Sequence, residues 1–370
     1  MDSQSIFCPN PACPARGQGG QGNIGIHSRK ERRYICRECG KTFAETKGTA
    51  FYRLHTAYDV VVIVVTLLAH GCPVQAIVVA FGLDERTVYD WQARAGQQCQ
   101  QVHAHLIQHP HDLGQVQADE LRVKKQGGIV WLATALQVST RLWLGGVVGS
   151  QRTFGLIAAL MKPVRACALH RPLLLCVDGL SAYVRAFRQT FRDPVQTGQP
   201  GRPRLKVWKG LCLGQVVKQY ERKHVVAVTR RIALGTAAQV KHLLQRTQTS
   251  DLIHTAYIER LNATFRTRLV ALVRRGHALA RQTVTLEYGM YLIGSVYNFC
   301  TFHRSLRLLN RRAGKKWSPR TPAMAAGITD HCWTIQELLS FHVPLSPWTP
   351  PKRRGRPSKA TQQLIARWCA

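Results

Sequence analysis

The chain has 370 residues, of which 52 are Lys or Arg and 19 are Asp or Glu, so its formal net charge is +33. A chain of this length can bury a full core and is long enough for more than one domain. Because the positive charge is spread over the whole length, we expect a polyanionic partner, and double-stranded DNA is the leading candidate. An anionic membrane surface is the weaker alternative.

The start of the chain, MDSQSIFCPN, lacks the charged and apolar regions of a signal peptide. The apolar run from Val60 to Ala69 is only about ten residues long, which suits a buried helix and is too short to span a bilayer. Four of the twelve cysteines cluster, and the others are scattered among apolar residues, as is typical of a reducing compartment. We therefore expect no membrane partner and a cytoplasmic, nucleoid-associated protein.

Residues 1–50 contain two cysteine pairs at metal-ligand spacing. Cys8 and Cys13 are separated by four residues, Cys36 and Cys39 by two, and 22 residues lie between the pairs. Four thiolates at such spacings predict a tetrahedral Zn²⁺ site that holds together a zinc ribbon. His27 could replace one of the ligands, and four free cysteines remain the alternative.

Residues 51–110 predict a helix-turn-helix domain. A helix begins at about Val74, a break follows at Gly82–Leu83, and Asp84 is placed to cap a second helix. A short turn with glycine between two helices is typical of helix-turn-helix motifs, although many helical hairpins do not bind DNA. The second helix would enter the major groove with Arg86, Thr87, Tyr89 and Arg94.

Residues 111–310 change to a strand pattern. VQADELRVKK, IVWLATALQV and RLWLGGVVGS predict a three-stranded antiparallel meander. A helix (153–167), an apolar strand that ends at Asp178 and another helix follow, which is the element order of a ribonuclease H-like fold. We expect an α/β domain with a mixed five-stranded sheet and an insertion at about 193–232. The first and fourth strands are neighbours in that fold, so Asp119, or alternatively Glu120, could converge with Asp178.

A third carboxylate is expected on the helix predicted from Tyr257 to Arg275. Its apolar stripe consists of Ile258, Leu261, Phe265, Leu269 and Leu272. Glu259 lies on another face, with Arg266 two turns further along. The few other acids of the region fall in expected loops (Asp193, Glu221), at an expected cap of this helix (Asp251) or on a later helix (Glu287). An ordinary amphipathic helix is the alternative.

Three blocks of the sequence together are similar to a known family. QADELRVKK, LLLCVDGLSAY and YIERLNATFR resemble the three catalytic blocks of DDE transposases of bacterial insertion sequences, and are closest to relatives of the insertion-sequence-one family. Members of that family also combine a zinc ribbon and a helix-turn-helix with this core. YNFCTFHRSLR and RTPAMAAG resemble the segment that follows the catalytic glutamate.

The resemblance implies an enzyme that cleaves and joins DNA at the ends of its element. Asp119, Asp178 and Glu259 would hold two Mg²⁺ (or Mn²⁺) ions, Arg266 would contact DNA, and the chain would act as a homodimer or larger multimer on DNA. Asp178 and Glu259 are 81 residues apart, a longer interval than is usual in the family. The alternatives are a DNA-binding regulator, a decayed or domesticated transposase, and a ribonuclease H-like nuclease without strand transfer.

Side chains near these blocks have less specific expectations. No protein nucleophile is required, so Tyr183 and Tyr257 are expected to pack or stack. For His303 we favour a structural role over one at the site.

Two basic segments contain Gly-Arg-Pro, a tripeptide that can place arginine in a narrow minor groove. One lies in the expected insertion, and the other resembles an AT-hook in the basic C-terminal region, 311–370. The Pro-rich tail that starts near Pro344 is expected to be disordered. The expected DNA contacts are Arg202, Arg204, Arg354 and Arg356. A solvated, charged linker is the alternative for both segments.

Overall fold

The computed structural model describes residues 2–4, 6–195, 201–222, 224–248, 250–272, 280, 282–310, 316–350 and 355–369. The chain divides into two compact units, one formed by Met1–Val60 together with Leu339–Ala370 and the other by Val61–Leu338. The segment after Leu339 thus belongs to the same unit as the cysteine-rich start. Among the described residues, no helix has both the length and the apolar character needed to cross a membrane.

The first unit is a small antiparallel sheet with one helix. Its elements are β1 (Ile24–Ser28), β2 (Arg33–Cys36), β3 (Thr42–Ala44) and α11 (Lys359–Trp368), and the sheet order is β1-β2-β3. Apolar residues surround the cysteines, including Tyr34, Phe43 and Trp368, each of which is buried.

The expectation of a disordered tail is wrong for the residues of α11. Ser358 caps this helix by accepting a hydrogen bond from the Thr361 backbone NH (3.2 Å). Leu364 and Trp368, four residues apart on one face, pack into the cysteine cluster's core. This short apolar stripe follows a Pro-rich segment, and its burial stabilises a helix that composition alone does not predict.

The described start of the second unit contains most of α1 (Tyr58–Ala69), followed by α2 (Val74–Phe81) and α3 (Glu85–Leu106). As predicted, α2 ends at Gly82, which has a left-handed φ of 62°, and Asp84 caps α3 by accepting from the Arg86 and Thr87 backbone NH groups. The helix α3 has 22 residues, and its second half packs against α8 (Thr283–Ser295). At this contact Gly96 lies against the Tyr288 backbone, so closely that a Cβ would be 2.5 Å from the Tyr288 carbonyl oxygen.

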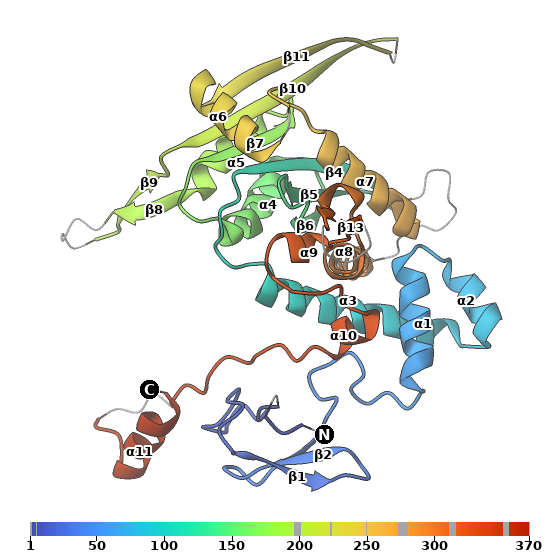
Figure 1. The fold of residues 1–370 in the computed structure, drawn as a ribbon, viewed down its shortest axis with the longest axis vertical. Helices are drawn as coiled ribbons and strands as arrows, with labels where there is room; N and C mark the ends of the chain where they lie inside the picture. The colour runs from blue at the N-terminus through green and yellow to red at the C-terminus, as the bar shows by residue number, and fades with distance from the viewer. Residues whose placement is uncertain are drawn as a thin grey trace. The chain divides into compact units, whose positions relative to one another are not determined.

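The central sheet has six strands in the order β11-β10-β7-β4-β5-β6 (Figure 1). The strands are β4 (Gln115–Lys125), β5 (Gly128–Gln137), β6 (Trp143–Gly149), β7 (Leu173–Asp178), β10 (Leu211–Glu221) and β11 (His224–Leu234). The first three form the predicted antiparallel meander, while β7 is parallel to both β4 and β10. The unit is therefore α/β with a mixed sheet, but the sheet has six strands, not the five expected.

The sixth strand comes from the region expected as an insertion. Residues 193–232 supply most of a two-stranded hairpin, β8 (Arg192–Val195) and β9 (Arg204–Val207), as well as β10 and most of β11. Figure 1 shows β10 and β11 continuing beyond the sheet as a long hairpin. Because β10 pairs with β7 in the middle of the sheet, this stretch is part of the fold and lengthens the interval between Asp178 and Glu259.

Helices cover both faces of the sheet. The helices that follow the meander are α4 (Phe154–Cys167), α5 (Ala182–Thr190), α6 (Ala237–Thr247) and α7 (Ala256–Arg268). The predicted apolar stripe of α7 is buried in a core made with β4, β5 and α8. The helix itself ends at Arg268, seven residues before the predicted end, and a 3₁₀ turn (Val270–Leu272) buries the last leucine of the stripe. It begins after Thr255, so Asp251 does not cap it.

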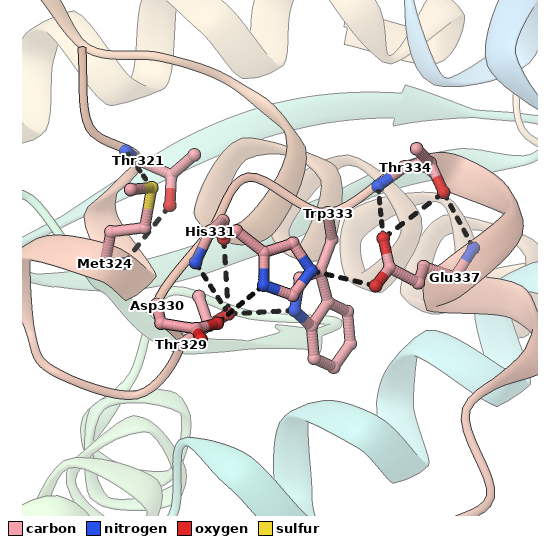
Figure 2. Close-up of polar contacts among 8 residues, drawn as sticks. All are labelled: Thr321, Met324, Thr329, Asp330, His331, Trp333, Thr334 and Glu337. Atoms are coloured by element: carbon pink, nitrogen blue, oxygen red, sulfur yellow. Dashed lines mark hydrogen bonds and ion pairs between the residues drawn. The ribbon is translucent and has the colours of Figure 1, made fainter. Parts of the chain in front are cut away.

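The last part of the unit is irregular. A π-helical turn (Val296–Cys300) extends α8, and a 3₁₀ turn (Arg304–Leu306) follows; the remaining elements are β12 (Leu308–Leu309), β13 (Trp317–Ser318), α9 (Pro322–Ala325) and α10 (Ile335–Ser340). Figure 2 shows the polar contacts that hold the segment between α9 and α10. His331 lies between two carboxylates, with Nδ1 2.6 Å from Asp330 and Nε2 2.8 Å from Glu337. Glu337 also accepts from the Thr334 backbone NH (3.0 Å), which fixes the first turn of α10.

Candidate active site and metal centres

The parallel pairing of β4 and β7 brings the first two predicted acids together. Gln117 is the partner of Cys176, and continuing that register by two residues sets Asp119 opposite Asp178 at the end of β7. Carboxylate oxygens of Asp119, Glu120 and Asp178 all lie within 4.8 Å of one another. Three carboxylates this close form an acidic cluster that could hold a metal ion.

The N-terminal end of α7 is fixed directly to β4. The Gln117 side-chain oxygen accepts hydrogen bonds from the backbone NH groups of Tyr257 and Ile258, both at 3.0 Å. One turn further along α7, the Asn262 amide donates to Asp119 Oδ2 at 2.8 Å. Glu259 lies between these two attachments, so β4 determines where its carboxylate can lie.

A cleft of about 420 Å³ is lined by Asp119, Asp178 and Glu259 together. The three predicted acids, which come from three distant segments, thus face one cavity. Glu259 is not part of the tighter acidic cluster; its Oε1 accepts from Thr255 Oγ1 and from Lys218 Nζ, both at 3.0 Å.

Glu120 occupies a different environment from Asp119, although the two are adjacent in sequence. Consecutive residues of a strand point to opposite faces, and Glu120 points toward α5, where the buried Tyr183 hydroxyl donates to it. Arg152 Nε donates to the same carboxylate at 2.7 Å. Burial raises the pKa of Glu120, while the bonds from Tyr183 and Arg152 oppose that rise. Tyr183 is inaccessible to a substrate in this position, as expected for a packing residue.

Two cations that the sequence reasoning missed neutralise part of the acidic charge. The Arg152 guanidinium contacts both Glu120 and Asp178, and Lys218 pairs with Glu259. The hydrogen bond to Glu259 raises the pKa of Lys218. Arg152 lies in the connection between β6 and α4, where no periodic pattern could indicate its direction. Lys218 lies two residues after Val216 on the same face of β10, and it could have been found only if β10 had been placed beside β7.

The donor set of the acidic cleft suits a hard divalent cation. Its candidate ligands are carboxylate oxygens, which Mg²⁺ and Mn²⁺ prefer, and the described residues that line the cleft include no Cys or His. Burial raises the pKa of Asp119, and the nearby Asp178 adds to the rise. A bound cation would relieve the repulsion between these two carboxylates.

The four cysteines of the first unit form a second potential metal centre. The Sγ atoms of Cys8 and Cys39 are 3.8 Å apart, as are those of Cys13 and Cys36, and all four lie within 4.8 Å of one another. A tetrahedron with Zn–S bonds of about 2.3 Å has edges of about 3.8 Å, whereas a disulfide would need about 2.05 Å. His27 is exposed and lies outside this cluster.

The predicted DNA contacts of the helical region lie near the start of α3. Arg86 and Tyr89 are exposed, and Thr87 and Arg94 are half-buried. Arg94 forms an ion pair with Asp90 at 2.6 Å, one turn earlier on the same helix. The structure thus leaves their role in DNA binding as a prediction.

The other predicted DNA contacts lie at several places in the chain. Arg202 and Arg204 are exposed at the β8–β9 hairpin, and Arg356 is exposed before α11. Arg354 falls outside the described residues. Arg266 is half-buried on α7 and is not among the residues that line the acidic cleft.

A comparison of the sequence with protein-family models finds no match, and neither does a comparison with curated proteins. The functional interpretation therefore rests on the residues and their geometry.

Proposed function

We propose that this chain is a DDE-type DNA transposase, which binds the ends of an insertion sequence and catalyses DNA cleavage and strand transfer. The observation that carries the proposal is the convergence of Asp119, Asp178 and Glu259 on one cleft in a chain of net charge +33. A strongly basic protein with few acids concentrates three of them in one cavity, which is the arrangement needed for cation-assisted chemistry on a nucleic acid.

The sheet supports the proposal through its order. Read as β6-β5-β4-β7-β10, it has an antiparallel meander followed by two parallel strands, which is the arrangement expected for a ribonuclease H-like fold. In chain order, the acids lie on the first and fourth strands of this unit, β4 and β7, and on the later helix α7. This is the distribution that the resemblance implies for a DDE site.

Different residues of the cleft would have different roles in the reaction. Asp119, Asp178 and Glu259 would hold Mg²⁺ or Mn²⁺, which when bound supplies an activated water or 3′-hydroxyl and stabilises the leaving oxygen. Asn262 and Gln117 orient Asp119 and α7. Lys218, at the cleft wall, can contact a phosphate oxygen once Glu259 turns to a cation.

The first unit and the helices would bind DNA. We infer that the cysteine cluster binds structural Zn²⁺, and that Arg86, Thr87, Tyr89 and Arg94 contact the element ends. The segments with Arg202, Arg204, Arg354 and Arg356 would add minor-groove contacts. The active form would be a homodimer or larger assembly on double-stranded DNA, located with the nucleoid.

The test uses the purified full-length chain and duplex DNA that carries the ends of its element. We expect Mg²⁺-dependent nicking and joining, and Asp178→Asn should reduce both by at least a hundredfold. The control is Asp193→Asn, which removes an acid that pairs with Arg165 outside the cleft. Unchanged activity in Asp178→Asn would refute the site, and nicking without joining would favour a nuclease. Binding without either reaction would favour a DNA-binding regulator or a decayed enzyme.

A further inference from the structure

A second cavity, of about 450 Å³, lies beside α7 and has the opposite electrostatic character. It is lined by Arg141, Tyr257, Arg260, Leu261, Thr264, Tyr297, His303, Arg304, Ser305 and Arg307. These ten residues include four arginines and no acid. Guanidinium groups that share a cavity repel one another, and an anion would remove that repulsion.

Arg141 is held in a defined orientation within this cavity. It lies in the turn between β5 and β6 with a left-handed φ of 59°, and its guanidinium stacks over the Tyr257 ring at 3.6 Å. Its buried Nη1 has no hydrogen-bond partner among the described residues. A guanidinium that is held against an aromatic ring and has an unpaired edge nitrogen can donate to a phosphate oxygen.

The opposite wall comes from the segment after α8. The Tyr297 hydroxyl contacts His303 Nε2 at 3.2 Å, and His303 Nδ1 is 3.3 Å from Ser305 Oγ. Burial, together with the positive charges of Arg260 and Arg141, lowers the pKa of His303 to about 4. The imidazole is therefore neutral at pH 7 and positions Tyr297 and Ser305, as expected for a structural histidine. The positive charge of the cavity comes from its arginines.

One helix separates this cavity from the acidic cleft. Tyr257, Arg260, Leu261 and Thr264 follow helical spacing along one face of α7, whereas Glu259 points to the other side. A helix with its side chains is about 10–12 Å across. Along the axis of a DNA duplex each strand advances about 3.4 Å per nucleotide, so about three or four base pairs would connect the two sites.

We propose that this basic pocket binds a backbone phosphate of a DNA strand whose reacting phosphate lies in the acidic cleft. The inference rests on the proposed function for the identity of the ligand. Arg141 and Arg260 provide the fork-like contacts, and Arg304 closes the exposed side. The DNA strand would thus be bound on both sides of α7, at the acidic cleft on one side and at the arginines of the basic pocket on the other.

The experiment measures binding of a 5′-phosphorylated thymidine dinucleotide to the full-length protein by calorimetry, in buffer without added divalent cations. Without divalent cations the acidic cleft repels the probe, and the difference in binding between wild type and variant reports on the basic pocket. The test variant is Arg260→Ala/Arg304→Ala, in which both arginines are exposed and their loss should leave the fold intact. The control is Arg122→Ala, an exposed arginine of β4 outside the pocket.

We expect the double variant to bind the dinucleotide at least tenfold more weakly and the control to match the wild type. Equal binding by all three proteins would overturn the proposal, as would inorganic phosphate binding as tightly as the dinucleotide, because the pocket would then hold a free anion. Since the measurement involves no cleavage, its failure is distinct from failure of the proposed function, which would appear as absence of nicking and joining by the wild-type protein.

Discussion

Replacement of Arg152 by alanine removes the cation that faces the buried side of the acidic cluster. The Glu120 side chain is 0% exposed, and Arg152 and Tyr183 are the partners of its carboxylate. Without the guanidinium, the folded protein must either bury an unpaired charge or bind a proton at Glu120. The substitution should therefore destabilise the unit Val61–Leu338.

The size of the effect follows from burial of the pair. Breaking a buried ion pair by removing one partner costs about 3–5 kcal/mol. The Arg152 side chain is 32% exposed, so solvent screens part of the interaction and we expect a loss of about 2–3 kcal/mol. For a unit of this size that loss lowers Tm by on the order of 5–10 °C. Calorimetric scans of the full chain, in buffer without added divalent cations, measure it.

The pH dependence gives the effect a characteristic sign. The folded-state pKa of Glu120 lies above its usual value of 4.5, so the folded state binds more protons and loses stability as pH rises above 4.5. Arg152→Ala raises that folded-state pKa further, which widens the pH range over which the folded state loses stability. The difference in Tm between wild type and variant should therefore be large at pH 7 and should shrink as the pH falls below 4.5.

A double-mutant cycle tests the cause. In a Glu120→Gln background the buried charge is absent, so Arg152→Ala should cost at least 1 kcal/mol less than in the wild type. Arg171→Ala, which removes an exposed partner of Asp112 at 3.4 Å, should change stability by less than about 0.5 kcal/mol. If Arg152→Ala costs the same with Glu and with Gln at position 120, the argument from the buried charge is refuted.

Three other predictions concern parts of the chain outside the acidic cleft. Cys36→Ala removes one of four clustered thiols, so metal analysis should show loss of bound zinc and the circular dichroism spectrum of the variant should change. Chelation of the native chain should produce the same spectral change. Gly96→Ala should destabilise by about 1–3 kcal/mol in denaturant unfolding because its Cβ would clash with the α8 backbone, whereas Gly155→Ala, whose Cβ meets no atom closer than 3.7 Å, should be neutral or slightly stabilising. NMR titration should show a pKa above 6.5 for His331, and Glu337→Gln should lower that pKa. The contribution of the His331 ion pairs to stability is present below pH 6.5 and is lost as pH rises through the folded-state pKa. An unshifted pKa would contradict these ion pairs.

Local patterns in the sequence predicted the local structure well. Gly82 and Asp84 mark a helix end and a helix start through their own backbone and side-chain chemistry, so the boundary between α2 and α3 was predictable. The strands of the meander and the apolar stripe of α7 were also predictable, because the spacing of their apolar residues matches the period of a strand or of a helix.

Features that depend on residues distant in the sequence were harder to predict from the sequence. The position of β10 beside β7 follows from long-range strand pairing, and the sequence between Pro194 and Ile232 carries no signal that separates a central strand from an inserted hairpin. The helix α11 is stabilised by the cysteine cluster more than 300 residues earlier in the chain. Arg152 acts from a connection between β6 and α4, where side-chain direction is set by tertiary contacts.

The choice between Asp119 and Glu120 as the first acid shows how geometry extends the sequence argument. Spacing alone leaves both open, since they are neighbours and both lie in the acidic cluster. Strand alternation directs Asp119 to the face where α7 carries Asn262 and Glu259, and Glu120 to the face of Tyr183. Glu120 is buried and accepts from Tyr183 and Arg152, so it holds the Arg152 guanidinium beside Asp178. This leaves Asp119 as the acid that can act with Glu259 across the cleft.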